Sequence, residues 1–91
     1  MKVYLVTIED DVEYGMNIEV YKTFEDAQNR VKHIVDSYMN SKEELFGMHK
    51  EICYKSKNYD WVILGLRYED EDSFDVELKI HIKEKEVLKC K

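Results

Sequence analysis

The chain contains no proline, three glycines and two cysteines among its 91 residues. Cys53 and Cys90 are far apart and do not form a CxxC pair, so we expect free thiols in a reducing compartment. The longest stretches without a charged residue, Val3–Ile8 and Trp61–Leu66, are six residues each. They are too short to cross a membrane or to form the apolar segment of a secretory signal. We therefore expect a cytoplasmic protein.

Basic residues are also few. Lysine and arginine together number 14 against 20 acidic residues, which gives a net charge of −6. Because contacts to phosphate dominate nucleic-acid affinity, we expect no direct binding to nucleic acid. An acidic surface instead supports solubility and steers a protein towards basic partners. With 44% hydrophobic and 37% charged residues the chain is typical of globular proteins, and its length fits one domain over residues 1–91.

Four segments have the patterns of β-strands. Lys2–Glu9 and Tyr59–Tyr68 carry apolar residues on both faces, which is typical of central strands covered on both sides. Met16–Lys22 and Phe74–Lys83 alternate apolar and polar residues, which predicts strands with one solvated face. The apolar set in these two alternating strands comprises Met16, Ile18 and Val20 in the first and Phe74, Val76, Leu78, Ile80 and Ile82 in the second.

The clearest element is a helix from Phe24 to about Met39. Thr23 is a good N-cap residue, and Asp26 three positions later gives a start that resembles a capping box. Glu25 and Asp26 also suit the positive end of the helix dipole. The apolar residues recur every three or four positions and form one stripe, which must lie on the sheet: Phe24, Ala27, Val31, Ile34, Val35 and Tyr38.

The segment Ser41–Asn58 is ambiguous. Three of its apolar residues fall at helical spacing: Leu45, Met48 and Ile52. A short second helix over about Lys42–Cys53 would explain them, although Gly47 weakens that interpretation. The predicted fold is α+β, with a four-stranded antiparallel sheet and one main helix on one face. Its order is β-β-α-(α)-β-β, in which the short second helix is left open.

The sequence contains no catalytic or metal-binding signature. His49 and Cys53 would share one face of a helix, but a zinc site needs three or four ligands. A loop starting at Asp70 has Asp75 and His81 where an EF-hand needs glycine and glutamate. A Gly-rich phosphate loop, a GxSxG elbow and a Cys–His pair are all absent. We therefore expect a non-catalytic protein with no cofactor and no metal.

Carboxylates are concentrated at two predicted hairpin turns, each beside a tyrosine. The first group is Glu9, Asp10, Asp11 and Glu13 with Tyr14, and the second is Glu69, Asp70, Glu71, Asp72 and Asp75 with Tyr68. Tyrosine supplies contact area at low entropic cost, and carboxylates pair with lysine and arginine. These eleven residues are therefore the predicted binding site for a basic protein surface. Whether the two turns lie at the same end of the sheet depends on the path of Ser41–Asn58, which the sequence leaves open.

The segments Lys2–Thr7 and Glu19–Ala27 resemble those of small phage and low-GC bacterial proteins with a hairpin leading into a helix. The small size, acidity and clustered carboxylates are similar to those of phage-borne inhibitors of host defence, anti-CRISPR proteins among them. This resemblance implies a stoichiometric inhibitor that occludes a basic surface of a host protein, such as a Cas effector or another defence nuclease. It would act in the host cytoplasm. The resemblance assigns no role to any single residue.

Two alternatives stay open at this point. The first is a small structural or accessory phage or bacterial protein that forms a homodimer through its sheet, with acidity serving solubility only. In that case Tyr21, Tyr54 and Tyr59 would be buried between subunits. The second is a small metal-dependent enzyme, which would contain stoichiometric metal after purification.

Overall fold

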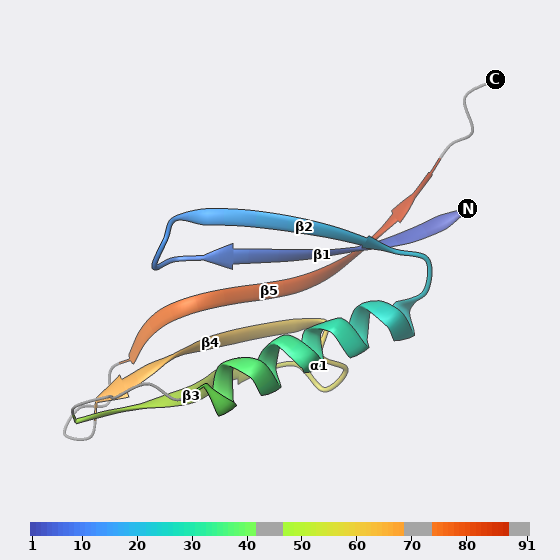
Figure 1. Cartoon of the computed structure of the whole chain (residues 1–91). Coiled ribbons are helices and arrows are strands. Elements are labelled where there is room, and N and C mark those ends of the chain that lie inside the picture. Colours follow the sequence, from blue (N-terminus) through green and yellow to red (C-terminus); the bar gives the residue numbers. More distant parts are fainter. Residues whose placement is uncertain (42–46, 69–73, 88–91) are drawn as a thin grey trace.

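A computed structural model describes residues 1–41, 47–68 and 74–87 (Figure 1). These residues form, in chain order, β1 (Lys2–Asp10), β2 (Gly15–Tyr21), α1 (Phe24–Asn40), β3 (Met48–Lys55), β4 (Trp61–Tyr68) and β5 (Phe74–Glu86). The five strands make one antiparallel sheet in the order β2-β1-β5-β4-β3. The first and last strands of the chain therefore lie side by side in the middle of the sheet. β1 and β4 are interior strands, as their two-sided apolar patterns predicted.

The α+β class is correct, but the four-stranded sheet in the order β-β-α-(α)-β-β is wrong. Met48–Lys55 forms a fifth strand, β3, where a short second helix was the suggested element. Met48 and Ile52 are four positions apart, and this spacing fits a strand period of two as well as a helical period of 3.6. Gly47 has a φ of 68°, a left-handed conformation that interrupts a helix. The third residue of the apolar set, Leu45, lies outside the described residues.

The helix α1 has the predicted start and runs one residue beyond the predicted end. The Thr23 hydroxyl accepts a hydrogen bond from the Asp26 backbone N–H at 3.1 Å. At the other end the Ser41 hydroxyl donates to the Tyr38 carbonyl oxygen at 3.0 Å. Among the described residues, no helix is long and apolar enough to cross a membrane.

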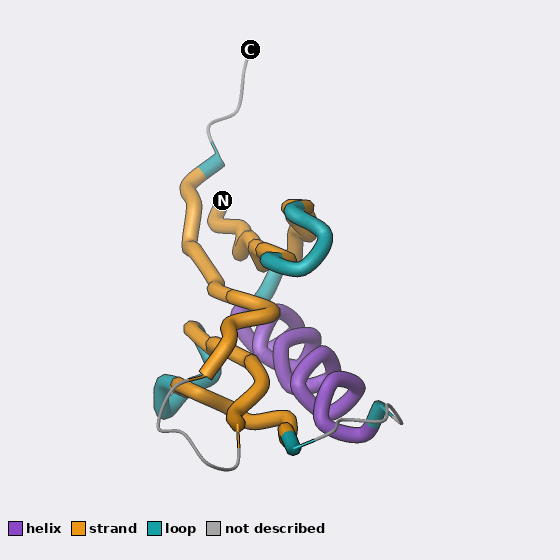
Figure 2. Tube along the Cα trace, turned by 90° about the vertical axis from the view of Figure 1, so that its left-hand side faces the viewer, coloured by secondary structure: helices purple, strands orange, loops and turns teal. Residues whose placement is uncertain are grey.

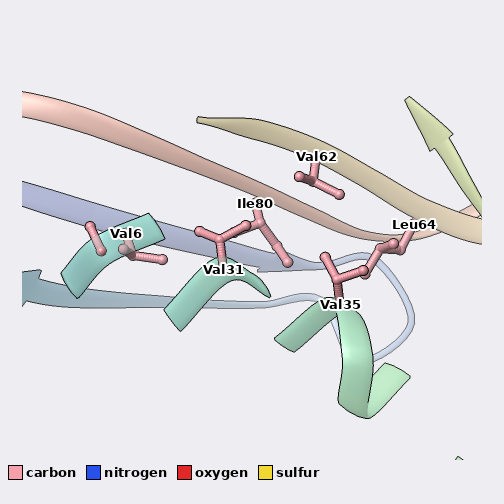
Figure 3. Packing of buried hydrophobic residues seen from close by; sticks show 7 residues of the cluster. Val6, Val31, Val35, Val62, Leu64 and Ile80 are labelled. Atoms are coloured by element: carbon pink, nitrogen blue, oxygen red, sulfur yellow. The ribbon is translucent and has the colours of Figure 1, made fainter. Parts of the chain in front are cut away.

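The core lies between α1 and one face of the sheet (Figure 3). The cluster of buried residues consists of Val6, Ala27, Val31, Val35, Val62, Leu64 and Ile80. Figure 2 shows the helix running along one side of the sheet. We call this side the helix face and the opposite side the free face. Alternation along each strand then assigns the remaining strand residues to one face or the other.

A β-bulge changes the alternation expected for β5. Leu64 pairs with Leu78, but the next residue of β4, Gly65, pairs with Val76, so Glu77 is an extra residue in β5. The expected single apolar face of Phe74–Ile82 is therefore wrong at its start. Val76 lies on the free face, and so does Phe74, which is 41% exposed. Glu77 is turned towards α1, where its Oε1 accepts a hydrogen bond from the Tyr38 hydroxyl at 2.5 Å.

The apolar side of β2 also faces away from the core. Met16, Ile18 and Val20 are 64%, 54% and 62% exposed and lie on the free face. The helix face of β2 carries Glu19 instead, whose carboxylate pairs with Arg30 of α1 at 2.7 Å. The predicted alternation of apolar and polar residues in β2 is correct. The expectation that its apolar face is the covered one is wrong.

Candidate protein-binding site

The first acidic turn lies at the same end of the sheet as the end of β4 and the start of β5 (Figure 1). β1 ends at Asp10, which pairs with Leu78 near the start of β5. β4 runs antiparallel to β5 and ends at Tyr68 beside that start. The turn from β1 to β2 and the described ends of β4 and β5 therefore lie at one end of the sheet, offset along β5 by the residues from Phe74 to Leu78. We call this region the acidic end, defined by the described residues Glu9, Asp10, Asp11, Glu13, Tyr14, Tyr68 and Asp75.

The first turn is organised by one of its own carboxylates. Oδ1 of Asp10 accepts hydrogen bonds from the backbone N–H groups of Val12, at 2.9 Å, and Glu13, at 3.0 Å. This arrangement is an Asx turn, which holds the backbone in a fixed path. The Asp11 N–H donates to the Glu77 carbonyl oxygen at 2.9 Å and ties the turn to β5. Asp10 therefore has a structural role in addition to its charge.

The same turn presents an aromatic side chain to solvent. Tyr14 is 93% exposed, and its φ of 55° is in the left-handed region. Asn, Asp and Gly adopt that conformation more readily than Tyr does, so the turn holds Tyr14 in an unfavourable backbone geometry. Glu13, beside it in the sequence, is also exposed. The first turn thus displays a carboxylate and an aromatic ring side by side on a backbone fixed by hydrogen bonds.

At the second turn the described residues interact with each other. The Tyr68 hydroxyl donates to Oδ2 of Asp75 at 2.7 Å across the β4–β5 pair. Tyr68, which the sequence predicted as a contact for a partner, thus makes a hydrogen bond within its own chain. The other predicted residues of this cluster, Glu69, Asp70, Glu71 and Asp72, lie outside the described residues.

Lys79 lies beside two carboxylates of the acidic end. Lys79 Nζ lies 3.7 Å from Oδ2 of Asp11, a distance at which an exposed ion pair contributes little. Lys79 also sits opposite Glu9 in the β1–β5 register. The next lysines along β5 on the free face, Lys83 and Lys85, pair with Leu5 and Val3 of β1 and therefore lie farther from this end.

A groove of about 460 Å³ separates the first turn from α1. Its lining contains three acidic residues and three basic ones: Asp10, Glu13 and Glu77, and Arg30, His33 and Lys50. The Lys50 ammonium also lies 4.9 Å from the centroid of the Tyr38 ring. His33 is exposed on α1, and the sequence analysis did not connect it with the acidic turn. The i and i+3 spacing of Arg30 and His33 was the available signal, since it puts both on one side of the helix.

Within the described residues, no group of three or more His, Cys, Asp or Glu side chains could hold a metal ion. Cys53 forms no disulfide. Burial raises the pKa of its thiol, and the nearby Glu51 carboxylate adds to the shift, so the reactive thiolate form is disfavoured. Cys90 lies outside the described residues.

The tyrosines expected to be buried in a homodimer occupy three different environments. Tyr21 lies on the helix face and donates a hydrogen bond to Glu19 at 2.6 Å. Tyr54 is 48% exposed and packs on Trp61, with ring centroids 4.6 Å apart. Tyr59 is in the turn between β3 and β4 and packs against the core. The three do not form one surface.

Comparison of the chain with protein-family models, with curated proteins and with solved structures gave no match.

Proposed function

We propose that the protein is a non-catalytic binding protein whose acidic end docks on a basic surface of a nucleic-acid-handling protein and blocks that surface. A defence nuclease, such as a Cas effector, is the partner class that we favour. The observation that carries the proposal is the position of the first acidic turn at the same end of the sheet as Tyr68 and Asp75, which flank the second acidic segment in the sequence. Carboxylates at one end of the sheet can contact one basic groove at the same time, which they could not do from opposite ends.

The geometry of the first turn supports this role. A binding surface gains affinity when its side chains are held in place before binding. The Asx turn at Asp10 and the hydrogen bond from Asp11 to β5 hold the exposed Tyr14 and Glu13 on a fixed backbone. Exposed tyrosine beside carboxylate is a combination that protein interfaces use for contact area and for pairing with arginine.

The charge at this end also predicts how binding depends on salt. Carboxylates that are exposed in the free protein attract a basic partner over about 10 Å at 0.1 M ionic strength. They raise the association rate more than they slow dissociation. We therefore expect the association rate to fall as salt is added, with a smaller change in the dissociation rate.

The test compares two pairs of charge reversals that change the net charge equally. Asp11→Lys with Glu13→Lys alters the acidic end. Glu84→Lys with Glu86→Lys alters exposed carboxylates at the far end of β5 and serves as the control. A partner captured from host lysate by the wild-type protein is then titrated with each variant, and its nucleic-acid binding is measured. Circular dichroism checks that each variant is folded.

We expect the acidic-end variant to lose at least about tenfold in affinity, which corresponds to about 1.4 kcal/mol, and to stop blocking nucleic acid. The control should bind like the wild type. Reversal of Glu69–Asp72 to lysine should have the same effect as the acidic-end variant. Equal inhibition by the wild-type protein and both acidic-end variants would rule out the proposed docking surface.

A further inference from the structure

The two edge strands of the sheet differ in how they are protected from pairing with another strand. Edge strands expose unpaired N–H and C=O groups, and natural proteins block them with bulges, lysines or prolines. At one edge, β3 has a register shift between Ile52 and Tyr54 and carries Lys50 and Lys55. At the other edge, β2 pairs with β1 in an uninterrupted register over Gly15–Tyr21. This segment contains no lysine, arginine or proline.

The unprotected edge also carries the largest group of exposed aliphatic side chains on one strand. Met16, Ile18 and Val20 project from the free face, and each is more than half exposed. Contiguous exposed apolar side chains on a small protein usually mark an interaction surface. An additional strand at this edge would pair the outer backbone groups and cover part of all three side chains.

The charge on β2 permits pairing with an identical strand. Its only charged residue is Glu19, and both carboxylate oxygens bind Arg30 of the same chain, at 2.7 and 3.1 Å. Two copies of β2 would therefore not place bare like charges opposite each other. The exposed Lys22 follows the strand at one end, and the acidic turn with Glu13 precedes it at the other. Antiparallel pairing would bring the lysine of each copy to the acidic turn of the other.

We propose that a second copy of the chain binds this edge, with β2 antiparallel to β2 around a twofold axis at Ile18. Ile18 then faces the same residue of the other copy, Met16 faces Val20, and Asn17 faces Glu19. Each apolar residue meets an apolar residue, and Lys22 lies beside Tyr14 and Glu13 of the other copy. The interface is isologous, so it closes at two copies. The bulge and lysines of β3 prevent the outer edges of the dimer from extending the sheet further.

This inference rests on the edge of β2 and does not depend on the proposed function, but the dimer borders the acidic end at Tyr14 and Glu13. Because one strand pair buries less than the roughly 1,600 Å² of a standard interface, we expect the dimer to form at about micromolar concentrations and above. Sedimentation velocity over a concentration series measures this equilibrium directly. A wild-type protein that stays monomeric up to millimolar concentration would overturn the proposal.

The register is tested by two double variants that differ only in the sign of one charge. In Met16→Lys with Val20→Lys, lysines face lysines in both cross-strand pairs, and we expect a monomer. In Met16→Lys with Val20→Glu, each lysine faces a glutamate of the other copy, and we expect the dimer to reappear with at least about tenfold tighter association than in the double-lysine variant. If both variants were equally monomeric, or equally dimeric, the proposed register would be wrong.

Tyr54→Lys serves as the matched control. Tyr54 is exposed to a similar extent and lies on the free face near the opposite edge, on β3. The edge dimer should tolerate this change, whereas a dimer that packs two free faces together should not. Loss of the dimer in Tyr54→Lys but not in the double-lysine variant would replace the edge proposal with a face-to-face arrangement. Circular dichroism of each variant confirms that the monomer is folded, and binding to the partner of the acidic end is scored separately.

Discussion

At the scale of single residues, the contact that most clearly couples β2 to the rest of the molecule is the ion pair between Glu19 and Arg30. The guanidinium donates to both carboxylate oxygens, and the Tyr21 hydroxyl donates to one of them at 2.6 Å. Both charged side chains are partly buried, at 24% and 35% exposure. Bidentate pairs of this kind have a defined geometry that single-point lysine contacts lack. The pair therefore fixes which face of β2 points towards α1, and by alternation it sends Ile18 to the free face.

This contact predicts a pH-dependent contribution to stability. Hydrogen bonds from Arg30, and then from Tyr21, lower the pKa of the Glu19 carboxyl from its usual 4.5. A carboxyl whose pKa is lower in the folded state stabilises the fold above its unfolded pKa, and this stabilisation disappears as pH falls through the folded pKa. We expect Glu19→Gln to reduce the free energy of unfolding by about 1 kcal/mol at neutral pH. The difference from wild type should shrink as the pH falls through the folded pKa of Glu19.

Urea unfolding of the wild type and of Glu19→Gln at about pH 7 and about pH 3 measures both quantities. Glu86→Gln, which alters a carboxylate paired with the exposed N-terminal ammonium at 3.0 Å, provides the control. Its effect should be small at both pH values because exposed pairs contribute little. An unchanged difference between Glu19→Gln and wild type in acid would show that packing, and not charge, explains the loss.

The residues of the acidic end could be predicted from the sequence, but their separate roles could not. The clustering of carboxylates is apparent from the amino-acid sequence alone. That Asp10 caps its own turn while Glu13 points outward depends on backbone angles that several loop conformations could provide. The contact between Tyr68 and Asp75 depends on the register of β4 with β5, which the bulge shifts by one residue. Arg30 and His33 reach the groove only because α1 crosses beside the first turn.

At the scale of secondary-structure elements, a periodicity repeated over many residues was enough to predict the element, whereas a short pattern was not. The helix has a cap and 17 residues with a consistent apolar spacing, and its start was predicted correctly. The strand β3 has too few apolar residues to distinguish a strand period of two from a helical period of 3.6, because a spacing of four positions fits both. The bulge in β5 depends on how β5 pairs with β4. The regular alternation of apolar and polar residues over Phe74–Ile82 does not reveal it. Only Gly65, isolated within an otherwise apolar strand, hinted at a close backbone approach.

That close approach predicts the effect of adding a single methyl group to β4. A Cβ atom at Gly65 would overlap the carbonyl oxygen of Asp75 and lie 3.1 Å from its carbonyl carbon and 3.2 Å from Sγ of Cys53. The overlapping atom belongs to the backbone of a paired strand and cannot rotate away as a side chain could. We expect Gly65→Ala to lower the free energy of unfolding by about 1–3 kcal/mol, as overpacking does elsewhere.

Gly15→Ala is the matched control for this change, because a Cβ there would have no neighbour within 4 Å. Its φ is not in the left-handed region, so the substitution introduces no strain. We expect a change within about 0.5 kcal/mol. Urea denaturation with intrinsic Trp61 fluorescence compares the two variants under one condition. Equal stability of Gly65→Ala and wild type would mean that the bulge relaxes without cost.

At the scale of the whole molecule, the packing is one-sided and elongated. The described residues span 58 × 25 × 23 Å, and the buried cluster lies between α1 and the helix face alone. The side chains of this cluster are small, mostly valine, and a core of this kind is in keeping with the limited burial of a short chain. The sequence could not predict the sheet order, because the pairing of β1 with β5 joins opposite ends of the chain. Local patterns carry no information about such long-range partners.

One-sided packing predicts that the same truncation has very different effects on the two faces. Val31 is fully buried between α1 and the sheet, and Val20 on the free face is 62% exposed. We expect Val31→Ala to lower the free energy of unfolding by about 2 kcal/mol, since it removes two buried methyl groups and leaves a cavity. Val20→Ala should change it by less than about 0.5 kcal/mol at protein concentrations where the chain is monomeric. Urea unfolding of both variants and wild type provides the comparison.

The concentration dependence of the same experiment separates the fold from self-association. Stability gained from a second copy grows with protein concentration by mass action, whereas stability gained from the core does not. As concentration rises, the deficit of Val20→Ala relative to wild type should therefore increase, because Val20 faces Met16 of the other copy in the proposed dimer. The deficit of Val31→Ala should stay constant, since Val31 contacts only its own chain. A Val20→Ala deficit as large as that of Val31→Ala in dilute solution would mean that the free face is already covered within a single chain.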